Sequence, residues 1–566
     1  MKKSLLLVAA FSLGLSFAHA QEQQELKPYS SIAINNELDT YFQSLSITKP
    51  TEAAITATMN NGKDGQLEKS GILIPCNISL KNSGTWTILP GGDRLWRIRI
   101  TSSEAMGLAP YFDEFFIPDG ARLHVYDEAK TSVQGAFTSM NNNETGEFAT
   151  WYVPGEVMVM EYYEPLAVKG QGRIRMNELS YFFRGIEMPA EVRASDPCEV
   201  DVNCSEGANW TRQRDGVVRI LVKTNGATGF CSGSIINNTQ QDCTPYILTA
   251  FHCGWDDAAG VMSTTTEFNQ YVFRYNYQKS GCGSGTVGAN VSQTGCAIRA
   301  WSNDQGGATG SDFMFVELNA NIASSVYPYF NGWDANTTAP AGGVGIHHPA
   351  GDVKKISTFT ATAISTKWGS GAPNGTHWRF SWAATANGNG VTEGGSSGSP
   401  LFRGSNGLIV GTLTGGASCC TANGCGTGTS LTAPDYYGKM SYHWTSNGTA
   451  ANRQLKPWLD PTNSGVLTLD GAYSPCSVSV PETSLDNIFE MYPNPTNGII
   501  NITLTNLMEQ SITVNVYNAF GQLVRSEKIA YGKSNHNIDL SNEAKGIYFV
   551  ELISGNKKSS KKIILQ

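Results

Sequence analysis

The sequence predicts an all-β protein with more than one domain. Short apolar stretches recur between turn signals, and residues 95–100 and 122–126 alternate apolar and polar side chains as strands do. The 60 glycines, the 22 tyrosines and the charged fraction of 16% suit β-rich domains with many turns. Because a single hydrophobic core stops growing at about 250–300 residues, we expect two to four domains in this chain of 566 residues.

Residues 1–20 have the pattern of a signal peptide. Lys2 and Lys3 precede an apolar run at 5–17, and Ala18-His19-Ala20 has the small-x-small form of a cleavage site. The apolar run is too short to span a bilayer comfortably, and no later stretch is long and apolar enough. We therefore expect export followed by removal of residues 1–20, with an uncleaved anchor as the alternative.

Export explains the cysteine content of the chain. In an oxidising compartment the 12 cysteines can pair as disulfides. No Cys-x-x-Cys pair is followed by a matching pair or by spaced histidines, so their spacing does not suggest zinc. We expect no metal and no cofactor. The net charge of −8 gives no reason to propose a nucleic-acid partner.

The first folded domain is expected over residues 21–193. It is β-like and holds one cysteine, Cys76, in contrast to the cysteine-rich region that begins at Cys198. Residues 188–194 (MPAEVRA) read as an exposed linker between the two.

The second domain is expected over residues 194–472. Short apolar runs without intervening helices predict an all-β sandwich or a pair of barrels. A short helix is expected only near the end, over 451–459. The apolar runs lie at 217–222, 246–250, 271–277, 313–318 and 408–413.

A linker over residues 473–486 precedes a third domain over 487–566. Strand-like runs at 499–504, 512–517 and 547–552, with no cysteine, predict a small β-sandwich. This domain contains no cluster of His, Asp and Ser that could carry chemistry.

Three short motifs in the second domain bear the residues of a serine nucleophile. Ser397 lies in a loop of small residues at 394–400 (GGSSGSP), His252 follows an apolar strand, and Asp312 opens another. Serine is a poor nucleophile until a base takes its proton and a carboxylate holds that base in the right tautomer. The sequence therefore predicts a catalytic His252, Asp312 and Ser397, although each residue alone also fits a structural role.

The small neighbours of Ser397 also predict an oxyanion hole. They let the backbone turn sharply, so that the amides of Gly395 and Ser397 can point at one spot beside the hydroxyl. Such donors stabilise the negative charge of a tetrahedral intermediate.

These motifs resemble the catalytic blocks of trypsin-like serine proteases, and more closely those of the bacterial lysyl endopeptidase branch. The resemblance covers about residues 196–472. It implies two packed β-barrels with the active site in the cleft between them, and peptide-bond hydrolysis through an acyl-enzyme. The matching segments are LTAFHC (248–253), SDF (311–313), GSSGSP (395–400), CEVDVNC (198–204), GIHHP (345–349), VTEG (391–394) and DYYG (435–438).

The resemblance also implies cleavage after a basic residue, preferentially lysine, with arginine as the other candidate. Asp435 matches the family's pocket carboxylate, which would pair with the substrate cation because an unpaired buried ammonium is very costly. A surface turn is the alternative for Asp435. Glutamate-directed specificity is the alternative preference, and Thr414 and Asp435 argue against it.

Other pocket residues follow from the same resemblance. Trp368 matches a family tryptophan beside the catalytic histidine, but the family's partner histidine for that ring is Thr414 here. Gly415 and Gly416 would leave the pocket mouth open. His347 and His348 are adjacent, so on a strand they point to opposite faces, and we expect them to be structural. We assign no chemistry to Glu393.

The family pattern implies three disulfides: Cys198–Cys420, Cys204–Cys282 and Cys231–Cys253, of which the last would fix the histidine loop. The partners of Cys243, Cys296, Cys419 and Cys425 cannot be deduced from the sequence.

Two interpretations compete for residues 21–193: a removable pro-domain and a permanent binding module. A protease must be kept inactive until export, so the pro-domain is favoured. A cut before Ala194 would follow Arg193, which a strictly lysine-specific enzyme would not process itself. The processing site and enzyme therefore stay open.

The third domain resembles the C-terminal sorting domain of the type IX secretion system. The resemblance rests on residues 491–495 (MYPNP), 546–550 (GIYFV) and the lysines of 557–562. It implies an outer-membrane secretion machinery as partner and a secreted or cell-surface protein. An accessory adhesion domain is the alternative.

Taken together, the sequence predicts a secreted serine endopeptidase made as a zymogen, monomeric and acting on proteins or peptides. The alternative from another class is a protease-like binding or adhesion protein with an inactive site.

Overall fold

The computed structural model describes residues 27–32, 38, 41–59, 65–184, 195–288, 291–420, 429–476, 489–504, 512–519, 521–529, 533, 535–554 and 557–566. The predicted signal peptide, the linker 188–194 with Arg193 and Ala194, and residues 477–486 of the second linker lie outside these residues. The chain forms two compact units, Met1–Cys476 and Ser477–Gln566. Each is described by itself.

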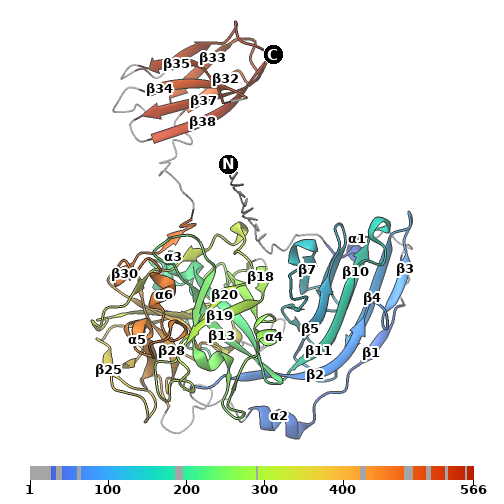
Figure 1. Cartoon of the computed structure of the whole chain (residues 1–566), viewed down its shortest axis with the longest axis vertical. Helices are drawn as coiled ribbons and strands as arrows, with labels where there is room; N and C mark the ends of the chain where they lie inside the picture. The colour runs from blue at the N-terminus through green and yellow to red at the C-terminus, as the bar shows by residue number, and fades with distance from the viewer. Residues whose placement is uncertain are drawn as a thin grey trace, which may run out of the picture. The chain divides into compact units, whose positions relative to one another are not determined.

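The first unit begins with an N-terminal β-lobe. One sheet of this lobe has the order β1-β4-β10-β6-β7, with β3 also paired to β4 (Figure 1). Its inward side chains, among them Trp96, Ile98 and Met160, are fully buried in one core. The strands are β1 (Ser44–Ser46), β3 (Thr85–Ile88), β4 (Arg94–Thr101), β6 (Arg122–Tyr126), β7 (Val133–Phe137) and β10 (Val157–Glu164).

A second sheet runs from this lobe into the next part of the unit. Its order is β18-β17-β12-β13-β2-β11-β5-β8, and β14, β19, β20 and β9 extend it. The strands are β2 (Lys69–Ser79), β5 (Gly107–Phe116), β8 (Phe148–Ala149), β9 (Val153–Pro154), β11 (Arg173–Phe182), β12 (Val217–Thr224), β13 (Ala227–Ile235), β14 (Tyr246–Thr249), β17 (Val272–Tyr275), β18 (Val291–Thr294), β19 (Cys296–Trp301) and β20 (Met314–Leu318).

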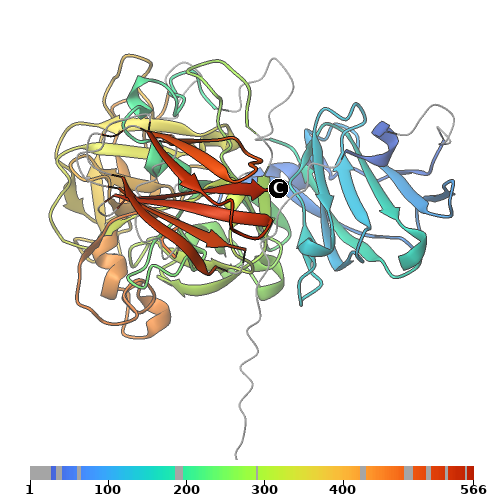
Figure 2. The ribbon, with the colours of Figure 1, turned by 90° about the horizontal axis from the view of Figure 1, so that it is seen from above.

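The junction between the two parts is the pairing of β2 with β13. Ile72 lies opposite Ala227 and Lys69 opposite Gly229 in an antiparallel register. The lobe and the part of the unit that contains β12 and β13 lie side by side in both Figure 1 and Figure 2, and this pairing joins them.

A tight hairpin connects β12 to β13. Asn225 and Gly226 both have positive φ, 39° and 79°, which is the backbone of a type I′ turn. Every residue of β12 is buried, consistent with its run of apolar side chains packed on both faces.

The last part of the first unit is a nine-stranded sheet of order β24-β23-β27-β28-β29-β26-β25, in which β22 also pairs with β28 and β30 pairs with β22. The strands are β22 (Trp333–Asp334), β23 (Gly343–His347), β24 (Lys355–Phe359), β25 (Ile364–Thr366), β26 (His377–Phe380), β27 (Pro400–Arg403), β28 (Ile409–Gly416), β29 (Asp435–Lys439) and β30 (Thr468–Leu469). Two small sheets pair β15 (Trp255–Asp256) with β16 (Val261–Met262) and β21 (Tyr329–Phe330) with β31 (Ala472–Tyr473).

The helices are short. The predicted helix over 451–459 is instead a 3-10 turn at Ala451–Arg453 followed by the one-turn helix α6, which has a proline near its start. The helices are α1 (Tyr29–Ile32), α2 (Glu52–Met59), α3 (Thr211–Asp215), α4 (Thr265–Phe268), α5 (Met440–Thr445) and α6 (Lys456–Leu459).

The second unit consists of two antiparallel sheets around one core. In β33 alternate residues, such as Ile500 and Ile502, are buried, as in a strand with one face on the core. One sheet holds β32 (Phe489–Tyr492), β33 (Ile499–Leu504) and β36 (Asn535–Asp539). The other holds β35 (Leu523–Ile529), β34 (Ile512–Asn518), β37 (Gly546–Ser554) and β38 (Lys557–Leu565).

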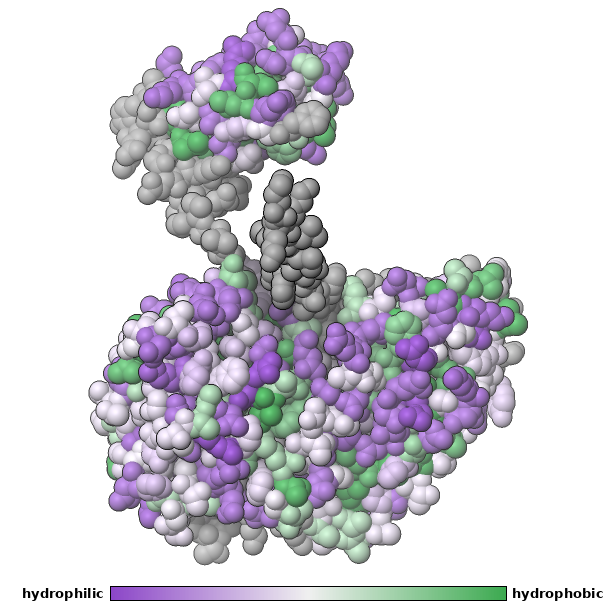
Figure 3. All heavy atoms as spheres, in the orientation of Figure 1, coloured by the Kyte–Doolittle hydropathy of each residue, from purple (hydrophilic) through white to green (hydrophobic). Residues whose placement is uncertain are grey.

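The all-β prediction is confirmed by these sheets. No helix among the described residues is both long and apolar enough to cross a membrane. On the face of the first unit seen in Figure 3, hydrophilic side chains are distributed over both parts.

Candidate active site

His252 lies directly after β14, on a 3-10 turn that spans Phe251–Gly254. A disulfide joins the next residue, Cys253, to Cys231 on β13, and therefore ties this turn to the strand beside it. The ring of His252 is buried, and its Nδ1 lies 2.7 Å from Asp312 Oδ2. The Asp312 Oδ1 atom also accepts the backbone N–H of His252 at 3.0 Å. The two residues are thus held in one orientation by two hydrogen bonds.

Asp312 is fully buried two residues before β20 and has a left-handed backbone with φ of 56°. Burial opposes ionisation of its carboxyl group, but the charge of His252 and the hydrogen bonds from it outweigh burial. They hold the pKa of Asp312 below its ordinary value. An ionised Asp312 can therefore fix the tautomer of His252.

Ser397 lies in the predicted loop, between two glycines with positive φ, Gly395 at 93° and Gly398 at 79°. A Cβ atom on Gly398 would clash with Thr249 Oγ1, so only glycine allows this approach to the histidine turn. The Ser397 carbonyl accepts the Ser232 N–H at 2.8 Å and contacts Cys253 Sγ at 3.8 Å. The loop is thus anchored against the segment that carries His252.

Ser397 and His252 are not hydrogen-bonded to each other. His252 Nε2 is buried and has no hydrogen-bond partner within the described chain, and Ser397 is half-buried. The structure therefore joins His252 to Asp312 and brings the Ser397 loop beside them. In enzymes without substrate the hydrogen bond from the nucleophile to its base is often long or absent.

The backbone amides of Gly395 and Ser397 donate no hydrogen bond to any described residue. Donors that are unpaired in this way are available to a substrate oxygen. The Gly395 carbonyl accepts the Ser232 hydroxyl at 2.9 Å, which helps to fix the orientation of this peptide.

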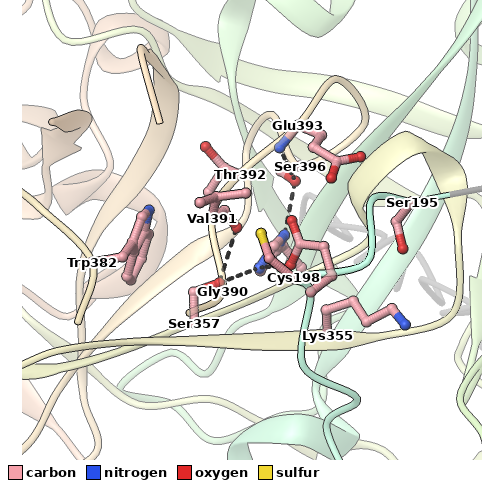
Figure 4. Close-up of polar contacts among 12 residues, drawn as sticks. Ser195, Cys198, Lys355, Ser357, Trp382, Gly390, Val391, Thr392, Glu393 and Ser396 are labelled. Atoms are coloured by element: carbon pink, nitrogen blue, oxygen red, sulfur yellow. Dashed lines mark hydrogen bonds and ion pairs between the residues drawn. The ribbon is translucent and has the colours of Figure 1, made fainter. Parts of the chain in front are cut away.

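A buried hydrogen-bond network that includes His347 adjoins the Ser397 loop, and Figure 4 shows its members Ser357, Val391, Glu393 and Ser396. Ser357 Oγ donates to the Val391 carbonyl at 2.9 Å, so it must accept from His347 Nε2 at 3.0 Å. His347 Nδ1 then accepts from Ser396 Oγ at 2.8 Å, and Ser396 Oγ accepts the Glu393 N–H at 3.2 Å. Burial and then Lys355 lower the pKa of His347 to about 3, so the ring is neutral.

Two glutamates lie beside this network. Burial first, and then the charge of Glu393, raise the pKa of Glu199 well above its ordinary value. Glu199 lies 3.9 Å from His347 Nε2. Burial also raises the pKa of Glu393 to about 7, although its carboxylate accepts the Asp196 N–H at 3.0 Å. The other adjacent histidine, His348, donates from Nδ1–H to the Asp352 carbonyl, 2.9 Å away.

Asp435 is fully buried at the start of β29, opposite Gly416 of β28. Its Oδ2 accepts hydrogen bonds from three side chains, whereas Oδ1 accepts one, from the Ser418 N–H at 3.1 Å. A Cβ on Gly416 would clash with Oδ1, so glycine is required there. Burial raises the pKa of Asp435 despite these bonds. The donors to Oδ2 are Trp382 Nε1 (2.6 Å), Thr392 Oγ1 (2.7 Å) and Ser418 Oγ (2.7 Å).

Trp368 is half-buried and packs edge-on against Tyr436, with ring centroids 5.1 Å apart. It also lies over Gly415, whose Cβ position is 3.2 Å from the indole ring. Thr414 Oγ1 forms a hydrogen bond of 3.0 Å with His377 Nε2. No motif in the sequence had marked His377. The charge of His377 also helps to lower the pKa of Asp312, although less than His252 does.

Four disulfides join cysteines within the described part of the chain. Three join the pairs that the resemblance implied, and the fourth joins Cys243 to Cys476, a cysteine that had no predicted partner. Cys419 is disulfide-bonded, Cys296 is a buried free thiol, and Cys425 lies outside the described residues. The three implied pairs are Cys198–Cys420, Cys204–Cys282 and Cys231–Cys253.

One group of side chains in the described chain has the spacing of metal ligands: Asp196, Glu393 and Cys420. Because Cys420 is in a disulfide, its sulfur is not available as a thiolate ligand.

Comparison with known proteins identifies two family domains. Residues 192–438 match the lysyl endopeptidase C-terminal domain, and residues 490–566 match the secretion system C-terminal sorting domain. The lysyl endopeptidase of Pseudomonas aeruginosa is 26% identical over 357 residues, which cover 60% of this chain and 72% of that protein. The secreted RxLR effector protein 73 of Plasmopara viticola is 23% identical over 326 residues, 55% of this chain and 75% of that protein.

Among solved structures, the thermostable serine protease AL20 from an extremophilic microorganism matches 40% of this chain and 92% of its own, at 16% identity and a TM-score of 0.28. The first match lies within the first compact unit and the second match within the second. The chain therefore carries a lysyl endopeptidase C-terminal domain followed by a secretion system sorting domain, and it is a secreted or cell-surface serine endopeptidase.

Proposed function

We propose that this enzyme cleaves peptide bonds after basic residues, preferentially lysine. The observation that carries the proposal is the buried carboxylate of Asp435, whose Oδ1 has a single donor and faces a position that only glycine can occupy. A lysine ammonium in the pocket would pair with Oδ1, and this pairing would compensate for its desolvation. A neutral or acidic side chain would leave the buried Asp435 unpaired or repel it.

In the proposed reaction Ser397 Oγ attacks the substrate carbonyl carbon while His252 Nε2 takes the hydroxyl proton. The amides of Gly395 and Ser397 stabilise the oxyanion, and Asp312 holds Nδ1–H and the charge of the imidazolium. His252 then gives its proton to the leaving amine as the C–N bond breaks. Water repeats the sequence on the acyl-enzyme and restores Ser397.

Hydrolysis of lysyl, arginyl, leucyl and glutamyl amide substrates by the processed protein tests this proposal. We expect lysyl substrates to be cleaved with the highest kcat/KM and the Ser397→Ala variant to be inactive. Activity that survives Ser397→Ala would refute the serine mechanism, and a preference for leucyl or glutamyl substrates would refute the role of Asp435.

We also propose that the N-terminal β-lobe keeps the enzyme inactive until it is removed. The support comes from residues 65–69, which we call the strap and which lead into β2. A Cβ atom added to Gly306 would clash with the Gly65 carbonyl oxygen. The same added atom would lie 3.2 Å from His252 Cβ, so Gly65, Gly306 and His252 are close neighbours. The Gly65 N atom is 3.2 Å from the Cβ position of Gly415. Gly65 thus contacts both Gly306, which adjoins His252, and Gly415, which precedes the Gly416 that lies opposite Asp435.

The rest of the strap is fastened to the protease region by side chains. Leu67 is 2% exposed and belongs to a core with residues of β12 and β13. Gln66 Nε2 donates to Asp257 at 2.8 Å, and Lys69 pairs with Asp256 at 3.3 Å. Glu68 pairs with Arg184 at 3.1 Å beside the Ser397 loop. A peptide substrate would have to displace these contacts.

The rate at which a fluorophosphonate labels Ser397 tests the proposed inhibition in the full chain. We expect slow labelling before cleavage and fast labelling after it. Leu67→Asp should accelerate labelling of the uncut chain, because a charged side chain does not fit the core. Leu166→Asp, at an exposed position of the same lobe, is the matched control and should leave the rate unchanged. Equal rates in the cut and uncut chains would refute the role of the lobe.

The sorting domain supports export across an outer membrane with the secretion machinery as partner. We propose that the protease acts as a monomer on protein substrates outside the cell. Intact mass and N-terminal sequencing of the exported protein would locate both processing sites.

A further inference from the structure

A second buried carboxylate, Asp304, lies directly beside Asp312. Asp304 is 2% exposed, and its Oδ2 accepts the backbone N–H of Asp312 at 2.7 Å. Its Oδ1 accepts the N–H of Gly307 at 3.1 Å, and its carbonyl accepts the N–H of Thr309 at 3.2 Å. The Asp304 carboxylate therefore links Gly307, in the middle of the loop over residues 304–312, to Asp312 at its end.

The backbone of Asp312 depends on such a contact. Its φ of 56° is in the left-handed region, which a residue with a side chain rarely adopts without support from its surroundings. The N–H of Asp312 is held by Asp304 on one side, while its carboxylate is held by His252 on the other. The hydrogen bond from Asp312 N–H to Asp304 thus acts on the peptide that determines where the Asp312 carboxylate points.

The same carboxylate fixes the turn that contacts the histidine. The Cβ position of Gly307 lies 3.4 Å from Asp312 Cβ and 3.1 Å from Trp368 Cδ1. The Cβ position of Gly306 lies 3.2 Å from His252 Cβ. By holding the Gly307 N–H, Asp304 keeps this turn packed against His252 and Asp312 together.

We propose that Asp304 is a positioning residue for the reaction: its carboxylate sets the main chain of Asp312 and of the Gly306–Gly307 turn, and so aligns Asp312 with His252. The inference rests on the catalytic roles proposed above for His252 and Asp312. Asp304 does not contact the substrate in this arrangement. It acts through the residue that orients the base.

The charge of Asp304 gives the role a distinct signature. Burial first, and then the charge of Asp312, raise the pKa of Asp304 to about 6. The titratable groups that interact with it are Asp312 and Tyr442 of α5, whose pKa is raised by burial and then by Asp304. His252 lies beyond Asp312, and His443 is reached through Ser311 at 2.8 Å. Above about pH 6 Asp304 therefore adds negative charge beside the His252–Asp312 pair.

The test compares Asp304→Asn with Glu317→Gln in the processed protein. Asparagine keeps the size of the side chain and one acceptor oxygen but loses the charge. Its NH₂ group would face one of the two N–H groups, of Gly307 or of Asp312, that the carboxylate accepts. Glu317 lies on β20 five residues after Asp312, is paired with Arg299, and provides a matched loss of one carboxylate. The measurements are kcat and KM for a lysyl amide between about pH 5 and 9, and the thermal midpoint.

We expect Asp304→Asn to lower kcat about 10- to 100-fold, the cost of a slightly misplaced catalytic group, with KM changed less than about threefold. The acid limb of kcat/KM should move to lower pH, because the His252–Asp312 pair then has less negative charge nearby to favour its protonation. The low-field proton resonance of the His252–Asp312 hydrogen bond should also shift. Glu317→Gln should change none of these.

An unchanged kcat in Asp304→Asn would overturn the proposal. A loss of kcat with an unmoved acid limb and an unmoved proton resonance would also overturn it, because a purely structural role predicts that result. Asp304→Ala is measured alongside, and the thermal midpoint shows whether either variant is folded. If His252→Ala and Ser397→Ala keep full activity, then the proposed triad has failed rather than the role of Asp304.

Discussion

The substitution Asp435→Asn removes the charge of the proposed specificity carboxylate while keeping its shape. A substrate lysine would then bury its ammonium group beside a neutral amide. Removing one partner of a buried ion pair costs about 3–5 kcal/mol. At about 1.36 kcal/mol for each tenfold change in rate, kcat/KM for a lysyl amide should fall about 200- to 5,000-fold.

The donors around Asp435 sharpen this expectation. Trp382, Thr392 and Ser418 all donate to Oδ2, so the amide introduced by Asp435→Asn can satisfy them only by turning its NH₂ group toward the other side of the pocket. Leucyl substrates bring no charge into the pocket, and their slow cleavage should change little. The ratio of lysyl to leucyl kcat/KM is therefore the quantity to measure.

Asp470→Asn, at an exposed aspartate of the same domain, is the matched control and should leave the ratio unchanged. If the lysyl-to-leucyl ratio of Asp435→Asn stays within about threefold of the ratio of the parent enzyme, the proposed ion pair is refuted. Thr392→Val provides a second check: one donor fewer should raise the pKa of Asp435 further. Because only the ionised carboxylate pairs with lysine, lysyl cleavage should then fail at a higher pH on the acid side.

Three further outcomes follow from the environment of the Ser397 loop. Burial raises the pKa of Glu393 from 4.5 to about 7, so the folded chain keeps a proton that the unfolded chain releases, and stability should fall as pH rises through that window. Glu393→Gln should flatten this fall in thermal unfolding between about pH 4 and 8; an identical slope would contradict the assignment. His347→Phe removes one hydrogen bond from each of the buried hydroxyls of Ser357 and Ser396 and should cost about 1–3 kcal/mol in urea unfolding; a cost under about 0.5 kcal/mol would exclude the network. Replacing Cys231 and Cys253 by serine opens a loop with a sequence separation of 22 and should lower the free energy of unfolding by about 3 kcal/mol, which calorimetry would measure. The same replacement should lower the rate of peptide hydrolysis. Full activity would show that the bridge does not position the histidine.

The parts of the site that could be predicted from the sequence are those with local signals. His252 and Asp312 each adjoin an apolar strand, and β14 and β20 pair directly, which brings the two residues within 2.7 Å. The glycines around Ser397 indicated a sharp turn, and both have positive φ. Strands were predictable for the same reason, since alternation and apolar runs are local patterns.

The parts that could not be predicted depend on contacts between distant segments. Gly65 reaches the site only because β2 pairs with β13, and nothing in residues 65–69 indicates that pairing. Cys243 and Cys476 are 233 residues apart, and no pattern in the sequence relates them. Trp368 packs on Tyr436 and Thr414 bonds to His377, and no local pattern in the sequence marks either contact. Asp304 looks like an ordinary loop aspartate until the fold places it beside Asp312.

If the N-terminal β-lobe is removed as proposed, the pairing of β2 with β13 has a consequence for the remaining chain. While the lobe is attached, residues Ala227–Gly229 are interior to a sheet, with neighbours on both sides. Loss of the lobe turns this stretch into an edge whose main-chain donors and acceptors are open to the solvent. An extended polypeptide would then be able to add to this edge as a new strand, and at high concentration the edges of two copies would be able to pair with each other.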